Sequence, residues 1–499
     1  MAKIEETLDI VKSSGKRVLV VGLGISGLES ARFLIRRGIP VTVIEKQPEA
    51  SFRARSKFAG ELPGLTHSGV EVVFGLDGEH IAPYLVDTGL VLLSPGVPIE
   101  SAIVGTIKRY KVPFVAEFEL GLQLHRGKSI VVTGSNGKST TSSLIDHILR
   151  LGRLSSVLCG NIGVPVISRD EVLQAPQGMD TVLVVEASSY QLEACTVLKP
   201  AVSVVLNISE NHLERHGTIE RYAAAKGRAL RLQTAEDLAV VNADDSMVVE
   251  MARSCRATQA VFGAKSEVEL QKLSGTWAHL PSLADGQGKI VVCRNGVREE
   301  YSTNRTKLLG AHNRYNMAAA ILVARHMGVA ADVVQQGLDS FLPLEHRLEM
   351  VWADDPRFII NDSKSTTVAA SLAALTTVVD HFPSSPIVLM IGGLSKAGSW
   401  SPLLTKISEH RTGSLFVVCF GKDASLLASH CRARGVPHVV STNLREATRE
   451  ALHRVSSGGV VLLSPGCASF DEFIDFEHRG AEFKRYVREE LGEGRGASA

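Results

Sequence analysis

Short apolar runs rich in Val, Ile and Leu recur along the whole chain and alternate with segments of helical periodicity. Each run is apolar on both faces, as the strands of a buried parallel sheet must be, and the intervening segments are long enough for crossover helices. Nearly all runs end in Gly, Ser, Asn, Asp or Glu, the residues expected where an open α/β sheet binds ligands. The pattern therefore predicts an α/β protein with sites at the strand C-termini. The expected strands are 17–24, 40–45, 90–96, 129–137, 181–189, 201–209, 358–363, 386–393, 414–421 and 459–466.

Chain length and local punctuation predict how these strands are grouped. The 499 residues correspond to about three domains at roughly 100–200 residues each. A new strand and a glycine loop begin after residue 116, and proline and charged residues interrupt the pattern near residue 343. We therefore expect domains at 1–116, 117–343 and 344–499. Residues 262–306 have a mixed, hairpin-like pattern and are expected to form a peripheral excursion.

Charge and hydropathy exclude several classes of protein. The 54 basic and 53 acidic side chains give a net charge of +1, so no global electrostatic attraction to nucleic acid or an anionic membrane is expected. Aromatic residues make up only 5%, which disfavours a stacking platform for single strands. No apolar run reaches eighteen residues, and the N-terminal residues lack the apolar run of a secretory signal. We expect a cytoplasmic protein without a nucleic-acid or membrane partner.

The seven cysteines fit the same compartment. Their number is odd and no pair has CxxC spacing, so a disulfide framework or zinc site is not expected. We expect reduced thiols that mostly act as small core residues. Cys467 differs because it lies in a glycine-bearing loop.

The motif TGSNGKST, at 133–140, stands between a predicted strand and a predicted helix. Backbone N–H groups of a glycine loop at a helix N-terminus bind polyphosphate, a lysine contacts the β- and γ-phosphate oxygens, and a hydroxyl can ligate Mg²⁺. Lys138 and Ser139 supply the last two groups. We expect a nucleoside triphosphate here, with the first glycine at 134 instead of the usual place in GxxxxGK[ST].

A second glycine pattern, GLGISG at 22–27, follows the first strand and opens a helix. The next strand ends in Glu45, at about the distance where a dinucleotide-binding fold places its ribose-binding acid. Taken alone, the pattern predicts NAD, and a purely structural glycine turn is an alternative. The same geometry binds any diphosphate. Two phosphate loops in one chain favour ATP at one and another phosphorylated ligand at the other.

Polar side chains also gather after two central strands and on the helix that follows. Glu186 ends a buried strand and is followed by hydroxyl groups, as a Mg²⁺ site requires. His212 follows the next strand and is either beside this site or a structural histidine. Lys226 stands on a helix face of small residues, where most lysines are merely solvated.

Three strand ends in the last third of the chain carry hydroxyl and ammonium groups. Their sequences are NDSKSTT at 361–367, GGLSK at 392–396 and SPGCASF at 464–470. Groups of this kind converging at strand ends suit a substrate that bears carboxylates.

Together these motifs resemble the Mur ligase family over nearly the whole chain. The resemblance is carried by TGSNGKST, by GNIG at 160–163, ExSSYQL at 186–192, HNxxN at 312–316 and HR at 346–347. GLGISG, NDSKSTT and LLSPGCASFDEF point to the branch that adds D-glutamate. The resemblance implies an α/β fold of three domains: an N-terminal Rossmann-like domain, a central P-loop ATPase-like domain and a C-terminal Rossmann-like domain.

The resemblance also implies roles for individual residues. The UDP-linked substrate would be bound by Ser26, Gly27, Glu45, Lys46, Ser94, Asn161 and Ser188. ATP would be bound by Gly134, Ser135, Asn136, Gly137, Lys138, Ser139, Thr140, Asn313, Asn316, Arg347 and Asp362. Of two Mg²⁺ ions, Ser139 and Glu186 would ligate one, and His212 with Lys226 the other, the lysine carrying a carbamate derived from CO₂. D-glutamate would be bound by Lys364, Thr366, Lys396, Ser469, Phe470 and Phe476. Lys138, His212 and Lys226 would be the catalytic residues.

The implied reaction belongs to peptidoglycan precursor synthesis. ATP would convert the carboxylate of UDP-N-acetylmuramoyl-L-alanine to an acyl phosphate, which the amine of D-glutamate would attack, with release of ADP and phosphate. These small molecules would be the only partners of a monomer. Two alternatives stay open. An NAD-dependent oxidoreductase leaves Gly137, Lys138 and Ser139 unexplained, and a nucleotide-controlled switch does not need the loops of the third domain.

Overall fold

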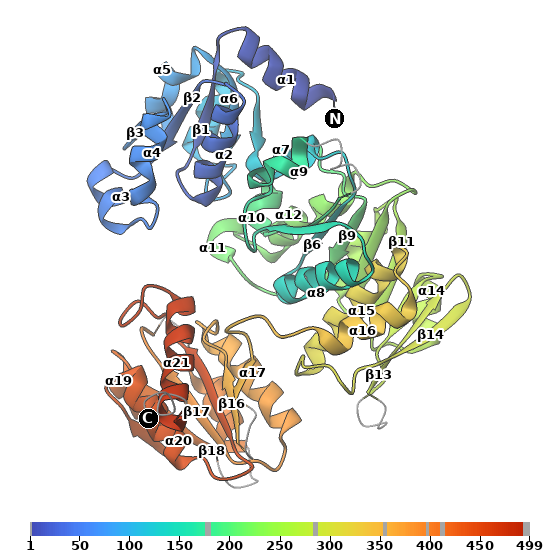
Figure 1. Cartoon of the computed structure of the whole chain (residues 1–499), viewed down its shortest axis with the longest axis vertical. Helices are drawn as coiled ribbons and strands as arrows, with labels where there is room; N and C mark the ends of the chain where they lie inside the picture. The colour runs from blue at the N-terminus through green and yellow to red at the C-terminus, as the bar shows by residue number, and fades with distance from the viewer. Residues whose placement is uncertain are drawn as a thin grey trace, which may run out of the picture. The chain divides into compact units, whose positions relative to one another are not determined.

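The structure is a computed structural model that describes residues 2–174, 181–282, 288–352, 357–395, 399–409 and 415–492. The chain forms two compact units, one of Met1–Arg305 with Arg314–Asp339 and one of Thr306–Asn313 with Ser340–Ala499. Three sheets carry the fold, two in the first unit and one in the second (Figure 1). All ten apolar runs expected to form strands do so.

The first sheet is a five-stranded parallel sheet in the order β3-β2-β1-β4-β5. Its strands are β1 (Arg17–Val21), β2 (Val41–Glu45), β3 (Glu71–Phe74), β4 (Thr88–Leu93) and β5 (Phe114–Ala116). Val18 and Val20 belong to one apolar cluster, and Leu19 and Val21 to another. Both faces of the sheet are therefore buried, as the uninterrupted apolar runs predict. The helices are α1 (Ala2–Ser13), α2 (Ile25–Arg36), α3 (Glu49–Arg55), α4 (Leu62–His67), α5 (Ala82–Leu85), α6 (Ala102–Arg109) and α7 (Glu117–Leu124).

The second sheet has nine strands in the order β14-β13-β12-β11-β10-β9-β6-β8-β7. They are β6 (Ser129–Thr133), β7 (Ser156–Gly160), β8 (Val182–Glu186), β9 (Val202–Val205), β10 (Leu238–Asn242), β11 (Thr258–Gly263), β12 (Trp277–His279), β13 (Lys289–Arg294) and β14 (Val297–Ser302). The helices are α8 (Lys138–Leu151), α9 (Asp170–Gln174), α10 (Ser189–Glu193), α11 (Leu213–His216), α12 (Ile219–Arg231), α13 (Ser246–Arg253), α14 (Glu267–Leu273), α15 (Ala311–His326) and α16 (Ala331–Ser340). Phe118 and Leu120 of α7 share one apolar cluster with Val18 of the first sheet and Val131 of the second. The first two sheets are thus joined by a continuous core.

The hairpin expected within 262–306 is present, but it is part of the sheet. Strands β13 and β14 pair antiparallel, with Arg294 opposite Val297 across a two-residue turn. Asn295 and Gly296 occupy that turn with φ of 52° and 77°. An Asn-Gly pair accepts positive φ at both positions, so it suits the tight turn of a hairpin. The segment continues the nine-stranded sheet to its edge instead of leaving it as an excursion.

The third sheet lies in the second unit and has the order β15-β16-β20-β17-β18-β19. Its strands are β15 (Glu349–Trp352), β16 (Phe358–Asn361), β17 (Ile387–Gly392), β18 (Leu415–Phe420), β19 (His438–Val440) and β20 (Val460–Gly466), all parallel except β15. Alternate residues face two clusters. Leu389 and Leu462 pack on the side of α17, whereas Met390 and Leu463 pack on the side of α21. The helices are α17 (Val368–His381), α18 (Ser401–Glu409), α19 (Ala424–Ala433), α20 (Leu444–Arg454) and α21 (Phe476–Leu491).

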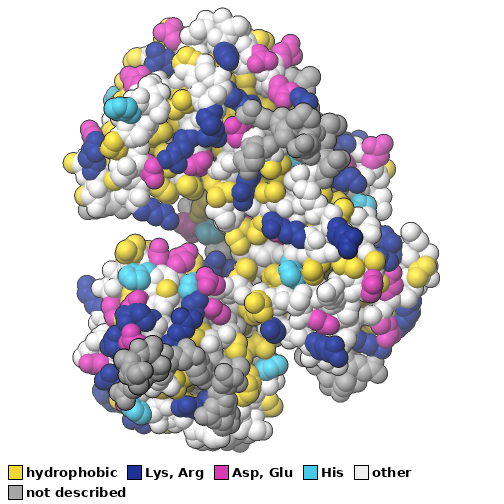
Figure 2. Space-filling model, in the orientation of Figure 1, with side chains coloured by type: hydrophobic (Ala, Val, Ile, Leu, Met, Phe, Trp, Pro, Cys, Tyr) yellow, Lys and Arg dark blue, Asp and Glu magenta, His cyan; other side chains and the backbone are white. Residues whose placement is uncertain are grey.

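The surface and the cysteines agree with the composition. Basic and acidic side chains are interspersed over the face drawn in Figure 2. Among the described residues, none of the helices has the length and apolar character needed to cross a membrane. All seven cysteines are free thiols, and five of them, including Cys467, are buried.

Candidate functional site

The glycine loop predicted to bind triphosphate connects β6 to α8. Gly134 and Gly137 have φ of 148° and 86°. A Cβ atom at Gly137 would lie 2.3 Å from Oδ1 of Asn316, so only glycine fits there, and Asn316 lies against the loop. Lys138 Nζ donates to the carbonyl oxygens of Gly134 and Ser135 at 3.0 and 2.9 Å. The lysine side chain is therefore folded back onto the loop, next to the place where the nucleotide phosphates are expected to bind.

The strand next to β6 places a carboxylate beside this loop. Glu186 ends β8 and pairs in register with Val132, one residue before β6 ends. Its Oε1 accepts a hydrogen bond from Nδ2 of Asn161 at 2.8 Å. Its Oε2 is buried and has no hydrogen-bond partner among the described residues. A buried carboxylate oxygen without a partner is costly unless a ligand occupies it.

Lys226 lies under the same loop and is almost completely buried, with 1% of the residue exposed. Its Nζ donates to the carbonyl oxygen of Gly134 at 2.9 Å and lies 4.7 Å from the centre of the Tyr222 ring. Burial and the nearby Lys138 ammonium lower the pKa of Lys226 to about 6, and Glu186 opposes this shift. Lys226 is therefore mainly neutral at pH 7. Lys226 is thus a buried residue, and the alternative that it is merely solvated is excluded.

His212 stands at the rim of the site in a strained conformation. Its φ of 54° lies in the left-handed region, which a histidine seldom adopts. Its Nδ1 lies 3.0 Å from the hydroxyl of Tyr190, and the two ring centres are 4.9 Å apart with the planes tilted by 55°. The side chain is 43% exposed, so it differs from a buried structural histidine. Tyr190 belongs to the ExSSYQL motif, but no feature of the sequence predicts its contact with His212.

These residues fit a magnesium ion held jointly with phosphate. Among the described residues, no three His, Cys, Asp or Glu side chains are grouped to hold a metal on their own. Mg²⁺ commonly binds to one or two carboxylates and to substrate phosphates, so such a group is not required. The partnerless Oε2 of Glu186 and the buried Ser139 supply oxygen atoms beside the loop. Unmodified Lys226 offers only a nitrogen atom, whereas Mg²⁺ prefers oxygen ligands.

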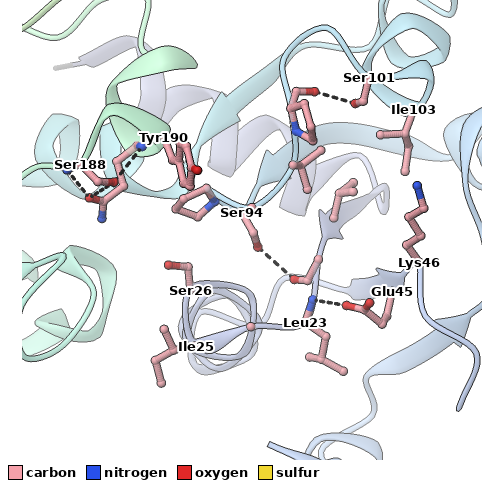
Figure 3. A pocket seen from close by; sticks show the side chains of 18 of the residues that line it. Leu23, Ile25, Ser26, Glu45, Lys46, Ser94, Ser101, Ile103, Ser188 and Tyr190 are labelled. Carbon is pink, nitrogen blue, oxygen red and sulfur yellow. Dashed lines mark hydrogen bonds between the residues drawn. The ribbon is translucent and has the colours of Figure 1, made fainter. Parts of the chain in front are cut away.

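The first unit contains a cavity of about 950 Å³. Its lining includes Ser26, Glu45, Lys46 and Ser94, beside the first sheet, and Ser188, beside the second (Figure 3). Asn161, just after β7, also lines it. Six of the seven residues predicted for the UDP-linked substrate therefore share one cavity. Lys138 and His212 line it as well. The lining also includes Tyr190, Ser101 and Ile103, for which the sequence predicted no role.

Gly27 is the seventh predicted residue and does not line the cavity, because it has a packing role. A Cβ atom there would lie 1.9 Å from the carbonyl oxygen of Gly22. Glu45 shapes the same loop, since its Oε2 accepts a hydrogen bond from the Leu23 N–H at 2.9 Å. Ser94 donates to the Gly22 carbonyl at 2.9 Å. Glu45, the acid that a dinucleotide-binding fold would use for ribose, is thus hydrogen-bonded to the backbone of the glycine loop.

Lys46 differs from these buried groups. Its side chain is 76% exposed and its Nζ forms an ion pair with Asp77 at 2.7 Å. Both residues line the cavity, where they could contact a polar ligand group.

In the second unit, Asp362 is buried at the end of β16. Its Oδ1 accepts from the Leu348 N–H at 3.2 Å, so it is tied to the residue after Arg347. Its Oδ2 accepts from Ser464 at 2.9 Å and from Ser365. Burial raises the pKa of Asp362 to about 6. Asn313, also in this unit, donates from Nδ2 to the Leu309 carbonyl at 2.6 Å.

The residues predicted for D-glutamate follow three neighbouring strands of the third sheet. Lys364 is exposed and its Nζ lies 5.2 Å from the centre of the Phe476 ring. Ser469 is buried, whereas Phe470 is 70% exposed. Thr366 is partly buried. Lys396 lies outside the described residues.

The lowered pKa of Lys226 predicts how the stability of the chain changes with pH. Between about pH 6 and 10.5 the lysine is neutral in the folded chain and protonated in the unfolded one. The unfolded state then binds more protons, so this group increases stability as pH rises. The gain in the free energy of unfolding from about pH 7 to pH 9 should be smaller in Lys226→Met than in the unsubstituted chain.

Urea titration in CO₂-free, metal-free buffer measures this gain. The exposed Lys272→Met is the control, and identical gains in all three would contradict the burial of a neutral amine.

Comparison with known proteins identifies the family. Three family models match the chain: the Mur ligase MurD-like N-terminal domain at 16–116, the Mur ligase middle domain at 132–324 and the Mur ligase glutamate ligase domain at 346–467. A UDP-N-acetylmuramoylalanine--D-glutamate ligase of Koribacter versatilis is 36% identical over 474 residues, covering 95% of this chain and 97% of the relative. The enzyme of the same name from Pelotomaculum thermopropionicum is also 36% identical, with the same two coverages.

Solved structures show the same fold at lower identity. The UDP-N-acetylmuramate-alanine ligase of Thermotoga maritima superposes with a TM-score of 0.57 at 18% identity, covering 96% of this chain and all of that one. A UDP-N-acetylmuramoylalanyl-D-glutamyl-2,6-diaminopimelate--D-alanyl-D-alanyl ligase of Acinetobacter baumannii gives 0.55 at 18% identity, covering 82% and 87%. The three matched domains and the identity along nearly the full length show that this chain is an enzyme of the Mur ligase family.

Proposed function

We propose that this enzyme joins D-glutamate to UDP-N-acetylmuramoyl-L-alanine in an ATP-dependent reaction of peptidoglycan precursor synthesis. One observation carries the proposal: a single cavity is lined by the N-terminal glycine loop and by Lys138 and His212 of the second sheet. A substrate whose diphosphate binds at Ser26 can extend its other end toward the phosphate loop. Relatives that are 32–36% identical carry this activity in their names.

The residues suit formation of an acyl phosphate. A carboxylate and an amine do not condense in water at a useful rate, so phosphoryl transfer from ATP must activate the carboxylate. Lys138 would stabilise charge on the transferring phosphoryl group. The N–H groups of Ser135 and Asn136 donate to the carbonyl and side-chain oxygens of Asn207 in this structure. When bound, Mg²⁺ would neutralise charge on the phosphate oxygens. The D-glutamate amine then attacks the acyl carbon, an amide bond forms and phosphate leaves.

We further propose that the metal and nucleotide ligands are those implied by the resemblance. Ser139 and Glu186 would hold one Mg²⁺, and His212 with carbamylated Lys226 a second. Asn316 lies in the first unit, whereas Asn313, Arg347 and Asp362 lie in the second. The enzyme would act as a monomer in the cytoplasm.

Carbamylation of Lys226 follows from its chemistry. A neutral amine adds to CO₂, which forms a C–N bond and releases one proton. The lowered pKa of Lys226, caused by burial, makes that neutral amine available at pH 7. The product is an anion with two oxygen atoms, which suit Mg²⁺ better than an ammonium group does.

The phosphate-loop lysine can be tested first. Lys138→Ala should lower the ligation rate by about 100-fold or more, because a preorganised charge at the transferring phosphoryl group is lost. Binding of the UDP-linked substrate, measured by calorimetry, should persist because the Ser26 loop is intact. Lys272→Ala, on the exposed face of α14, is the control. Ligation within threefold of the unsubstituted enzyme would contradict the triphosphate assignment.

Amine specificity tests the reaction itself. Phosphate release with Mg-ATP, UDP-N-acetylmuramoyl-L-alanine and single amino acids should favour D-glutamate over L-glutamate and D-aspartate by roughly 100-fold or more in kcat/KM. The shorter side chain would leave a cation of the pocket unpaired, and the L-isomer would misplace its amine. Equal turnover of the D- and L-isomers would refute a stereospecific pocket. Phosphate release independent of any amino acid would favour the nucleotide switch, and NAD-dependent thermal stabilisation the oxidoreductase.

Chemical rescue tests the carbamate. Lys226→Ala should lose most ligation, and acetate or formate should restore part of it by supplying carboxylate oxygens in the space of the side chain. Lys138→Ala is the matched control, because its missing group is a cation that no carboxylate replaces. Undiminished activity of Lys226→Ala would end the proposal for this lysine, and a loss that carboxylates do not relieve would argue against the carbamate.

A further inference from the structure

The second unit contains a completely buried arginine that the proposed reaction does not use. Arg479 has 0% of its surface exposed and lies in the first turn of α21. Burial lowers its pKa to about 10, so it remains a cation at pH 7. A buried cation is costly without compensation, and the positive end of a helix dipole adds to that cost. We therefore ask which interactions compensate for the burial of Arg479.

Its guanidinium group is bonded to the ends of three adjacent parallel strands. Nε donates to Ser363 Oγ at 3.0 Å and Nη2 to the Ser363 carbonyl at 2.8 Å, just beyond β16. Nη1 donates to the Cys467 carbonyl at 3.1 Å, just beyond β20, and to the Gly392 carbonyl at 3.5 Å, at the end of β17. These strands are neighbours in the sheet order β16-β20-β17. One side chain therefore spans three loops that are about 30 to 100 residues apart along the chain.

The loops fixed in this way are the ones that carry the expected amino-acid ligands. Ser363 precedes Lys364, and Cys467 stands two residues before Ser469. Ser363 Oγ also donates to the carbonyl oxygen of Phe476 at 2.8 Å. The hydrogen bonds of Arg479 and Ser363 thus join the segments that follow the three strands to the start of α21.

Direct contacts between two of the loops make this arrangement tight. Leu394 and Ala468 exchange two backbone hydrogen bonds of 2.9 Å. A Cβ atom at Gly393 would lie 2.3 Å from the Ala468 carbonyl oxygen and 3.3 Å from Nη1 of Arg479. The guanidinium is therefore packed against the loops as well as bonded to them.

We propose that Arg479 is the positioning residue of the D-glutamate site: its buried guanidinium sets the spacing of the three loops that hold the amino acid. This inference rests on the proposed function. Arg479 does not touch the substrate, because it has no exposed surface. A planar fork with five donors can bond three carbonyl groups in different directions, whereas a lysine ammonium at the end of a flexible chain cannot reproduce that geometry.

The test compares Arg479→Lys and Ser363→Ala with the unsubstituted full-length enzyme. Arg479→Lys should raise KM for D-glutamate by about tenfold or more, because small displacements of positioning groups have large effects. KM for the UDP-linked substrate should stay within about twofold, since its expected ligands lie in the first unit. Ser363→Ala, which removes one bond of the guanidinium, should raise KM for D-glutamate by about threefold. In the double variant the two effects should combine to less than their product, because they share one interaction.

Two control variants match these changes. Arg488→Lys makes the same replacement at an exposed position of α21. Thr448→Val removes a buried hydroxyl whose bond is to the Leu444 carbonyl. Both should leave KM for D-glutamate unchanged.

The outcomes separate the inference from the function on which it rests. An unsubstituted enzyme that does not use D-glutamate contradicts the proposed function. Normal use of D-glutamate together with an unchanged KM in Arg479→Lys overturns the positioning role, even if kcat or the melting temperature falls. If Arg479→Lys does not fold, Ser363→Ala decides alone: an unchanged KM for D-glutamate overturns the proposal, and a selective rise supports it.

Discussion

The central strands of all three sheets are buried on both faces, and this constraint decides where chemistry can occur. A strand packed by apolar residues on either side leaves no room for polar side chains along its length. Thr133, Glu186, Asn361 and Gly392 all stand at the carboxyl ends of parallel strands. Because neighbouring parallel strands end at the same edge, residues distant in sequence meet there. Both the phosphate loop and the loops held by Arg479 arise from this one rule.

At the edge of the second sheet, two lysine side chains are brought close together beside a buried carboxylate. Lys138 and Lys226 both donate to the carbonyl oxygen of Gly134. Burial and this proximity to Lys138 lower the pKa of Lys226, while one oxygen of Glu186 has no partner within the part of the chain that the structure describes. A polyanion bound at the loop and a metal ion at Glu186 would complete this arrangement. The geometry is thus prepared for a ligand before the ligand binds.

In the third sheet, the polar groups at the strand ends are hydrogen-bonded to one another. There, the loop carbonyls are bonded by a single buried arginine, and Asp362 is bonded by the hydroxyls of Ser365 and Ser464. Hydrogen bonds of this kind are strong when one partner is charged and water is excluded. They hold the loops that follow β16, β17 and β20 in fixed positions relative to each other, so this edge is rigid where the proposed amino-acid ligands begin.

Local sequence indicated ten of the strands, the two glycine loops and a hairpin within 262–306, because apolar periodicity and the steric freedom of glycine act over a few residues. It also indicated the family, whose motifs surround Lys138 and Glu186. Tertiary structure alone decided that Lys226 is buried instead of solvated, that Glu45 is bonded to the Leu23 N–H, that residues 262–306 extend a sheet, and that Arg479 spans three strand ends. Burial and bonds between segments far apart in the chain depend on how the sheets and helices pack, and no local pattern encodes that packing.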